Sequence, residues 1–194
     1  ENIMQTFNTK IDGASTTIGV VVPSVTTAKP AKALTDIHHV LLMDGSGSMY
    51  PHAGQVVTSV KNIVGALPDG DKFTLIQFRG VDDYTVHMLR ASCDDSALQY
   101  IDKLSRVGGT TCFSSPVNHT VEISNNSVVD ENMVVHLFTD GEPVVPWSDE
   151  EELQRVLTSL DSISSKLLAV NTYGFGSYYS ESIMNAVSTH YPSS

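Results

Sequence analysis

Positive charge is scarce in this chain of 194 residues. It contains 11 lysines and arginines against 22 aspartates and glutamates, which gives a formal net charge of −11. No basic cluster offsets this balance. The composition therefore argues against nucleic acid or an anionic membrane as the main partner. An acidic surface is suited instead to divalent cations or to basic partners.

Long apolar runs and cysteines are also few. No stretch approaches the length of apolar sequence that a transmembrane helix needs, so we expect no membrane insertion. The two cysteines, Cys93 and Cys112, do not resemble a disulfide scaffold, and we expect free thiols. Because the sequence begins with Glu1, we expect a processed or excised piece of a longer chain. Its compartment stays open between the cell surface or secretion and the cytosol.

Strand-like and helix-like segments alternate from Ile37 onward. The predicted strands cover residues 37–43, 73–78, 84–89, 133–138 and 167–173. The predicted helices cover residues 56–67, 97–104, 115–124, 148–163 and 180–190. This alternation predicts an α/β fold of three layers, with a doubly wound, mostly parallel sheet and helices on both faces. Residues 84–89 are short and more polar, and we place them as an antiparallel edge strand.

The N-terminal part of the chain has a different character. Residues 1–15 are polar and are expected to be irregular, and residues 16–22 are β-branched and predict one strand. Residues 24–35 contain two prolines and are interpreted as a connector. We therefore expect an N-terminal extension over residues 1–35 and one domain over residues 36–194.

Three polar loops accompany the predicted strands: MDGSGSM at 43–49, GGTT at 108–111 and TDGE at 139–142. Ligands of such sheets bind beyond the carboxyl ends of the strands, so we expect the loops to meet at one edge. Their candidate ligands all carry oxygen: Asp44, Ser46, Ser48, Thr110 and Asp140. Hard oxygen donors with only two carboxylates favour Mg²⁺ or Mn²⁺.

The same three loops resemble the metal-ion-dependent adhesion site of the von Willebrand factor type A family. The matching parts are Asp44-x-Ser46-x-Ser48, the threonine after Gly108-Gly109, and Thr139-Asp140-Gly141, in the family's order. The resemblance extends over about residues 37–190 and implies a Rossmann-like domain. It also implies a last edge strand after His190, which is missing here or replaced, for which residues 16–22 are a candidate.

The resemblance implies a role for each of these residues. Ser46 and Ser48 would bind the metal directly, and Thr110 directly or through water. Asp44 and Asp140 would hold metal-bound waters and supply charge. The remaining position of the ion would go to an aspartate or glutamate of a partner protein. The implied function is a metal-dependent adhesion or interaction module, not an enzyme.

Other residues near these loops are candidates for contact with a partner. They are Tyr50 and His52 after the serines, Thr111 as the rival of Thr110, and Glu142 after Asp140. Trp147 is either an exposed recognition residue or a packed part of its loop. Of the seven histidines, none forms a pair at the helical i, i+4 spacing of a zinc site, and those in strands are expected to pack or to form hydrogen bonds.

Two alternatives remain. The first is a metal-independent intracellular scaffold that uses another face of the domain. The second is a Mg²⁺-dependent phosphoryl-transfer enzyme with Asp44 as nucleophile. The second is disfavoured because Ser46 stands where a further acid would hold Mg²⁺, and because the three loops contain no lysine to bind phosphate.

Overall fold

The computed structural model describes residues 36–104, 107–129, 131–176 and 183–191. It also describes the backbone alone for residues 3–11, 14–22, 181 and 182. The chain divides into two compact units, one formed by residues 1–34 with 193–194 and the other by Thr35–Pro192.

The N-terminal unit contains an antiparallel hairpin. Strand β1 (Ile3–Ile11) pairs with β2 (Ala14–Val22), so that Ile3 lies opposite Val22. Strand β1 therefore corrects the expectation that residues 1–15 are irregular. Because β2 pairs with β1 in a separate sheet, it does not replace an edge strand of the main sheet. The connector expected at 24–35 lies outside the described residues.

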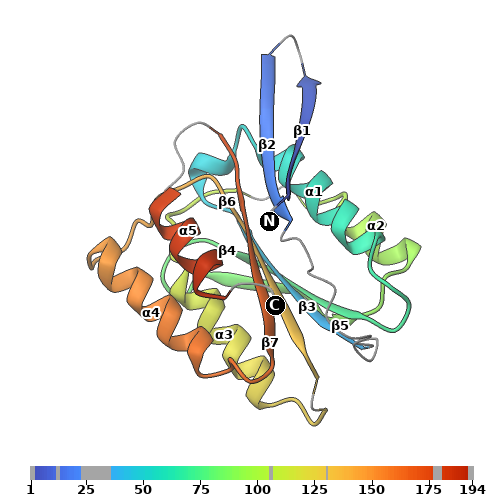
Figure 1. Ribbon diagram of the computed structural model, residues 1–194, viewed down its shortest axis with the longest axis vertical. Coiled ribbons are helices and arrows are strands. Elements are labelled where there is room, and N and C mark those ends of the chain that lie inside the picture. Colours follow the sequence, from blue (N-terminus) through green and yellow to red (C-terminus); the bar gives the residue numbers. More distant parts are fainter. Residues whose placement is uncertain are drawn as a thin grey trace. The chain divides into compact units, whose positions relative to one another are not determined.

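The second unit is built on a five-stranded sheet in the order β5-β4-β3-β6-β7 (Figure 1). The strands are β3 (His38–Asp44), β4 (Lys72–Phe78), β5 (Tyr84–Ala91), β6 (Met133–Thr139) and β7 (Leu167–Gly174). Neighbouring strands are parallel except for β5, which runs antiparallel to β4 at the edge. The predicted fold class is confirmed.

Helices cover both faces of this sheet, as Figure 1 shows. They are α1 (Ala53–Gly65), α2 (Asp95–Ile101), α3 (Ser114–Asn125), α4 (Asp149–Asp161) and α5 (Glu181–His190). Helices α3, α4 and α5 pack on one face and α1 and α2 on the other. No described helix is both long enough and apolar enough to cross a membrane.

Strand β3 is buried on both sides, as expected for the centre of a parallel sheet. Val40 and Leu42 pack in the core under α3, α4 and α5, whereas Leu41 and Met43 pack against α1 and α2. The strand order reverses at β3, with β4 on one side and β6 on the other. The carboxyl end of β3 therefore lies at a switch point, where open sheets of this class bind ligands.

Candidate metal centre

The carboxyl ends of β3 and β6 bring two acidic loops together. The two strands are parallel, and Met43 lies opposite Phe138, so the next residues, Asp44 and Thr139, lie at the same edge of the sheet. Asp140 follows immediately. The sequence therefore predicted correctly that loops separated by almost one hundred residues meet here.

Asp44 is held by hydrogen bonds from both loops. Its Oδ1 accepts from the backbone N–H of Ser46 at 2.7 Å, and its Oδ2 accepts from the Thr139 hydroxyl at 2.6 Å. The side chain belongs to a residue only 2% exposed. Burial raises the pKa of Asp44 to about 6, and the nearby Asp140 adds to this rise, whereas the hydrogen bonds from Thr139 and Ser46 oppose it. A cation would favour the ionised form of this carboxylate.

The two serines continue this set of oxygen atoms. The Oγ atoms of Ser46 and Ser48 lie 3.0 Å apart, and the Ser48 hydroxyl donates to Asp140 Oδ1 at 2.9 Å. Their hydrogen atoms therefore have acceptors within the cluster, while oxygen lone pairs remain for a metal. The Thr139 hydroxyl also accepts from the backbone N–H of Gly141 at 3.1 Å, which fixes the start of the loop that carries Asp140.

The Gly-Gly loop is joined to the serine loop through the backbone. Gly47 N–H donates to the carbonyl of Gly109 at 3.2 Å, and Gly108 N–H donates to the carbonyl of Gly45 at 2.8 Å. Gly108 and Gly109 have φ of 150° and 89°, in the region that favours glycine. The GGTT loop therefore also reaches the site, as the other two loops do.

The two threonines of this loop are oriented differently. Thr111 is 2% exposed. A Cβ placed on Gly141 would lie 3.8 Å from Thr111 Oγ1 and 3.7 Å from Ser48 Oγ, so both hydroxyls flank this glycine. Thr110 is exposed, and its Oγ1 would lie 2.6 Å from a Cβ on Gly80, in the loop after β4. The structure therefore places the Thr111 hydroxyl close to Gly141, in the loop that carries Asp140, whereas the sequence favours Thr110 as the metal ligand.

The candidate contact residues occupy different environments around the site. Tyr50 is 77% exposed and Glu142 is also exposed. His52 is half-buried, and its Nε2 lies 3.0 Å from the Cβ position of Gly176, in the loop after β7. Trp147 is a packed part of its loop, because its Nε1 donates to Glu152 at 2.7 Å.

The chemistry of the donors fits a hard divalent cation. The cluster offers two carboxylates and several hydroxyl oxygens, without a thiol or an imidazole, which favours Mg²⁺ or Mn²⁺ over softer ions. In the described part of the chain, no group of three or more histidine, cysteine, aspartate and glutamate side chains is placed to hold a metal. A metal at this edge would therefore need hydroxyl oxygens in addition to the two carboxylates.

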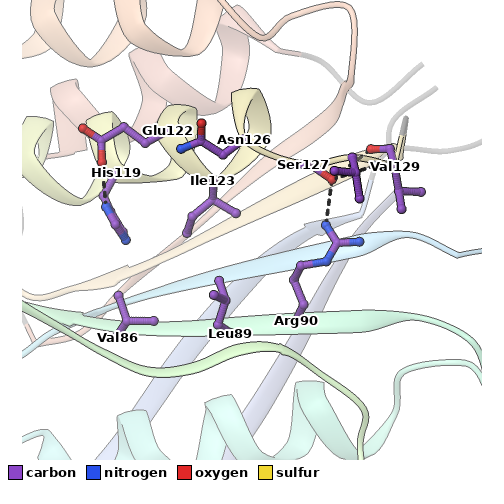
Figure 2. A pocket seen from close by; sticks show the side chains of 10 residues that line it. Val86, Leu89, Arg90, His119, Glu122, Ile123, Asn126, Ser127 and Val129 are labelled. Carbon is purple, nitrogen blue, oxygen red and sulfur yellow. Dashed lines mark hydrogen bonds and ion pairs between the residues drawn. The ribbon is translucent and has the colours of Figure 1, made fainter.

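A cavity of about 460 Å³ opens elsewhere, between β5 and α3 (Figure 2). Val86, Leu89 and Ile123 form an apolar part of its wall. Its charged groups are already paired, since Arg90 bonds to Ser127 at 3.0 Å and His119 lies 2.9 Å from a Glu122 oxygen. The cavity presents an apolar wall rather than converging reactive groups.

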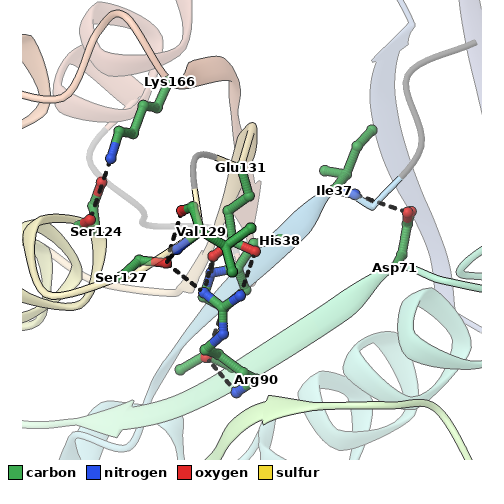
Figure 3. Close-up of polar contacts among 10 residues, drawn as sticks. Ile37, His38, Asp71, Arg90, Ser124, Ser127, Val129, Glu131 and Lys166 are labelled. Atoms are coloured by element: carbon green, nitrogen blue, oxygen red, sulfur yellow. Dashed lines mark hydrogen bonds and ion pairs between the residues drawn. The ribbon is translucent and has the colours of Figure 1, made fainter.

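The histidines of β3 and β6 belong to two polar clusters, in which His38 and His136 are buried and His39 is half-buried. In the first, shown in Figure 3, Glu131 pairs with Arg90 and lies 3.1 Å from His38 Nδ1, and His38 Nε2 lies 2.8 Å from the Thr74 hydroxyl. Burial lowers the pKa of His38, although Glu131 opposes this. These contacts confirm that His38 has a structural environment, as expected for a histidine in a strand.

The second set crosses three strands. His39 lies 3.1 Å from Asp71 and 3.1 Å from His136, and His136 lies 3.2 Å from the Tyr173 hydroxyl. Burial lowers the pKa of His136 to about 3 and also lowers the pKa of His39. Both rings are therefore neutral at pH 7, and each can donate from one nitrogen and accept at the other.

Sequence reasoning did not identify two residues that support the site. Thr139 bonds to Asp44, and Glu152 accepts the backbone N–H groups of Phe113 and Ser114 at 2.7 and 2.8 Å. Thr139 belongs to the TDGE motif and could have been found as a hydroxyl at a strand end. Glu152 lies outside all three motifs.

The geometry defines a class of protein. It is an α/β domain with a cluster of oxygen ligands at the carboxyl end of β3, where the strand order reverses. Residues 39–142, more than half of the chain, match the von Willebrand factor type A domain. The chain therefore belongs to that family. Among curated proteins, no sequence matches significantly.

Solved structures with a similar fold come from several sources. Proximal thread matrix protein 1 from the mussel byssus is 18% identical, with a TM-score of 0.63, over 80% of this chain and 42% of that one. A von Willebrand factor type A protein from Catenulispora acidiphila is 18% identical, with a TM-score of 0.61, over 91% of this chain and 39% of that one. The pilus adhesin SpaC from Lactobacillus rhamnosus GG is 22% identical, with a TM-score of 0.51, over 72% of this chain and 18% of that one.

These likenesses concern the fold. The chain spans less than half the length of each of these proteins. One structure of the mussel protein has a zinc-occupied MIDAS motif, and it is 22% identical over 80% of this chain and 39% of that one, with a TM-score of 0.60. The structures that share this fold thus include a matrix protein and a pilus adhesin.

Proposed function

We propose that this domain binds a protein partner through a divalent cation held at the carboxyl ends of β3 and β6. The observation that carries the proposal is the hydrogen-bonded set of Asp44, Ser46, Ser48, Thr139 and Asp140. It collects hard oxygen atoms from two loops that are remote in sequence. The metal-bound MIDAS motif of a protein with the same fold supports the proposal.

The residues of the site would have different roles in binding Mg²⁺ or Mn²⁺. Ser46 and Ser48 would supply neutral oxygen ligands, because their hydrogen atoms can be donated within the cluster. Thr111 is taken as the third hydroxyl, in preference to Thr110, because it is buried and its Oγ1 lies 3.8 Å from the Cβ position of Gly141, which follows Asp140. Asp44 and Asp140 would provide negative charge. When bound, such an ion offers a coordination position to a carboxylate of the partner.

Exposed side chains around the cluster would contact the rest of the partner. Tyr50 follows the serines and is 77% exposed, and Val144 is 58% exposed. Val144 is fixed near the site because its N–H donates to the carbonyl of Thr111 at 2.7 Å. These apolar groups add contact area beside the ion, and Glu142 adds charge at the same edge.

Calorimetric titration with Mg²⁺ and Mn²⁺ tests the metal site. We expect the wild-type domain to bind either ion, and the Ser46→Ala, Ser48→Ala double variant to lose binding. Ser188→Ala is a matched control on α5 and should bind as the wild type does. Thr111→Val should lose binding and Thr110→Val should retain it. The reverse result for the two threonines would restore Thr110 as the ligand.

Partner capture tests the interaction itself. We expect a lysate partner to be retained in Mg²⁺, released by EDTA and lost from the double-serine variant. Retention of the same partner in EDTA would favour the metal-independent scaffold. Turnover of a phosphate ester that depends on Asp44 would favour the enzyme.

A further inference from the structure

Helix α4 buries a carboxylate in its first turn. The helix begins with four consecutive acids, Asp149 to Glu152. The first three are exposed, whereas Glu152 is 0% exposed. A buried charge of this kind is costly unless it has close partners, so its surroundings require a physical explanation.

Four donors surround the Glu152 carboxylate. Its Oε1 accepts the backbone N–H groups of Phe113 at 2.7 Å and Ser114 at 2.8 Å. Its Oε2 accepts the Ser114 hydroxyl at 2.9 Å and Trp147 Nε1 at 2.7 Å. The thiol of Cys112 also lies 3.6 Å from Oε1. The carboxylate is therefore fully satisfied without a cationic side chain among these partners.

The carboxylate acts as the cap of another helix. Helix α3 begins at Ser114, and the residue before it, Phe113, has no side chain that can cap the free N–H groups. Glu152 takes this role from α4, at a helix end that attracts negative charge. The start of α3 is therefore fixed by a residue almost forty positions further along the chain.

Both sides of the metal candidate are connected to this cap. The capped residue Phe113 lies two positions after Thr111, and the Trp147 ring belongs to the segment that follows Asp140. The two segments are also joined directly, because Val144 N–H donates to the Thr111 carbonyl. Glu152 thus holds the threonine loop and the aspartate loop against the same helix.

We infer that Glu152 is a positioning residue for the metal centre. It does not touch the ion; it fixes the Thr111 hydroxyl relative to Ser48 and Asp140 by capping α3 and bonding Trp147. This inference rests on the proposed metal site. It assigns to α4 a role in metal affinity that its surface acids, Asp149 to Glu151, do not share.

The Glu152→Gln variant tests whether Glu152 affects metal affinity separately from the stability of the fold. The amide oxygen can still accept the backbone N–H groups at the start of α3. The amide NH₂ would replace Oε2 and would face the Ser114 hydroxyl and Trp147 Nε1, which both donate to Oε2 in the wild type. We expect Glu152→Gln to weaken Mg²⁺ and Mn²⁺ binding about tenfold, the lower end of the effect of residues that orient metal ligands. Trp147→Phe removes one of the four bonds and should weaken binding less, while folding normally.

Two control variants complete the experiment. Val156→Ala removes apolar volume one turn further along α4, where Val156 is 1% exposed, and so destabilises the same helix without touching the cap. Glu151→Gln removes an exposed charge beside Glu152. We expect both controls to bind metal with wild-type affinity, even where Val156→Ala lowers the melting temperature as much as Glu152→Gln.

Calorimetry and the emission of Trp147, the single tryptophan of the chain, give two readouts. We expect metal to change this emission in the wild type and to change it only at higher metal concentration in Glu152→Gln. Wild-type affinity in Glu152→Gln, or an equal loss of affinity in Val156→Ala, would overturn the inference and leave the metal site intact. A wild-type domain that binds neither ion would overturn both.

Discussion

Replacing Asp44 by asparagine should stabilise the metal-free domain at neutral pH. Asp44 is buried, and its pKa is raised to about 6 from a reference value of 3.8. The folded state therefore binds its proton more tightly than the unfolded state does. Stability from this group is complete below pH 3.8 and is lost as the pH rises through 6. Above that range the fold carries the cost of an ionised buried carboxylate.

The pKa difference sets the magnitude. At pH 7.5 the cost is about 3 kcal/mol, and at pH 5 it is about half of that. In Asp44→Asn, the side-chain oxygen can accept from Ser46, but the Thr139 hydroxyl loses its acceptor, which costs about 1 kcal/mol. We therefore expect a net gain of about 2 kcal/mol at pH 7.5 that shrinks to about 0.5 kcal/mol at pH 5.

Urea denaturation in EDTA at pH 7.5 and pH 5 measures both values. Asp69→Asn, in an exposed turn, is the control and should leave the free energy of unfolding unchanged within about 0.5 kcal/mol. Titrating histidines affect the wild type and the variant equally and cancel in the difference. A variant that is less stable than the wild type by the same amount at both pH values would refute the reasoning. Added Mg²⁺ should reverse the order of stability.

Further predictions concern one histidine, two glycines and a helix cap. Because burial lowers the pKa of His136 to about 3, the folded state binds fewer protons below pH 6.5. Stability from this ring should be complete above pH 6.5 and fall by about 2 kcal/mol at pH 5, and His136→Gln should flatten the urea-derived profile. Gly45→Ala places Cβ 2.7 Å from Gln77 Nε2, so it should lower stability by about 1–3 kcal/mol in calorimetry. Gly54→Ala, with no atom within 4 Å of its Cβ, should raise stability by about 0.5–1 kcal/mol. Asp94 caps α2, because its Oδ1 accepts the backbone N–H of Ala97. Asp94→Ala should lower the free energy of unfolding by about 1 kcal/mol, measured by thermal unfolding. A Gly45→Ala variant that is more stable than the wild type, a Gly54→Ala variant that is less stable, or a pH profile unchanged in His136→Gln would contradict these contacts.

The fold was predictable because the hydrophobic pattern changes period at each element. The apolar run that became β3 and the helical spacing that became α1 specify alternating elements, and alternation restricts the sheet to one class. The hairpin was missed because β1 is polar for a strand. The sequence Asp12-Gly13 between β1 and β2 is a favoured hairpin dipeptide and was the available signal.

The candidate site was predictable in part, for a physical reason. Strand ends in a parallel sheet lie at one edge, so Asp44 and Asp140 had to be neighbours. The pattern could not show that Thr111 is buried near Gly141 while Thr110 is exposed, because the directions of adjacent loop residues depend on the backbone. Glu152 is an acidic residue like its exposed neighbours Asp149 to Glu151, so residue type does not distinguish it. Only its helical phase with Val156 and Leu160, which are both buried, indicates that it faces inward.

The hydrogen bonds between Asp44 and Thr139 and between Ser48 and Asp140 join residues 95 and 92 positions apart. Contacts this distant in sequence form only when the central strands have paired, so the cluster cannot assemble in a partly folded chain. An ion that binds it selects the complete fold and shifts the folding equilibrium by mass action. The metal concentration would then control the fraction of the domain that is folded, as well as its binding to a partner.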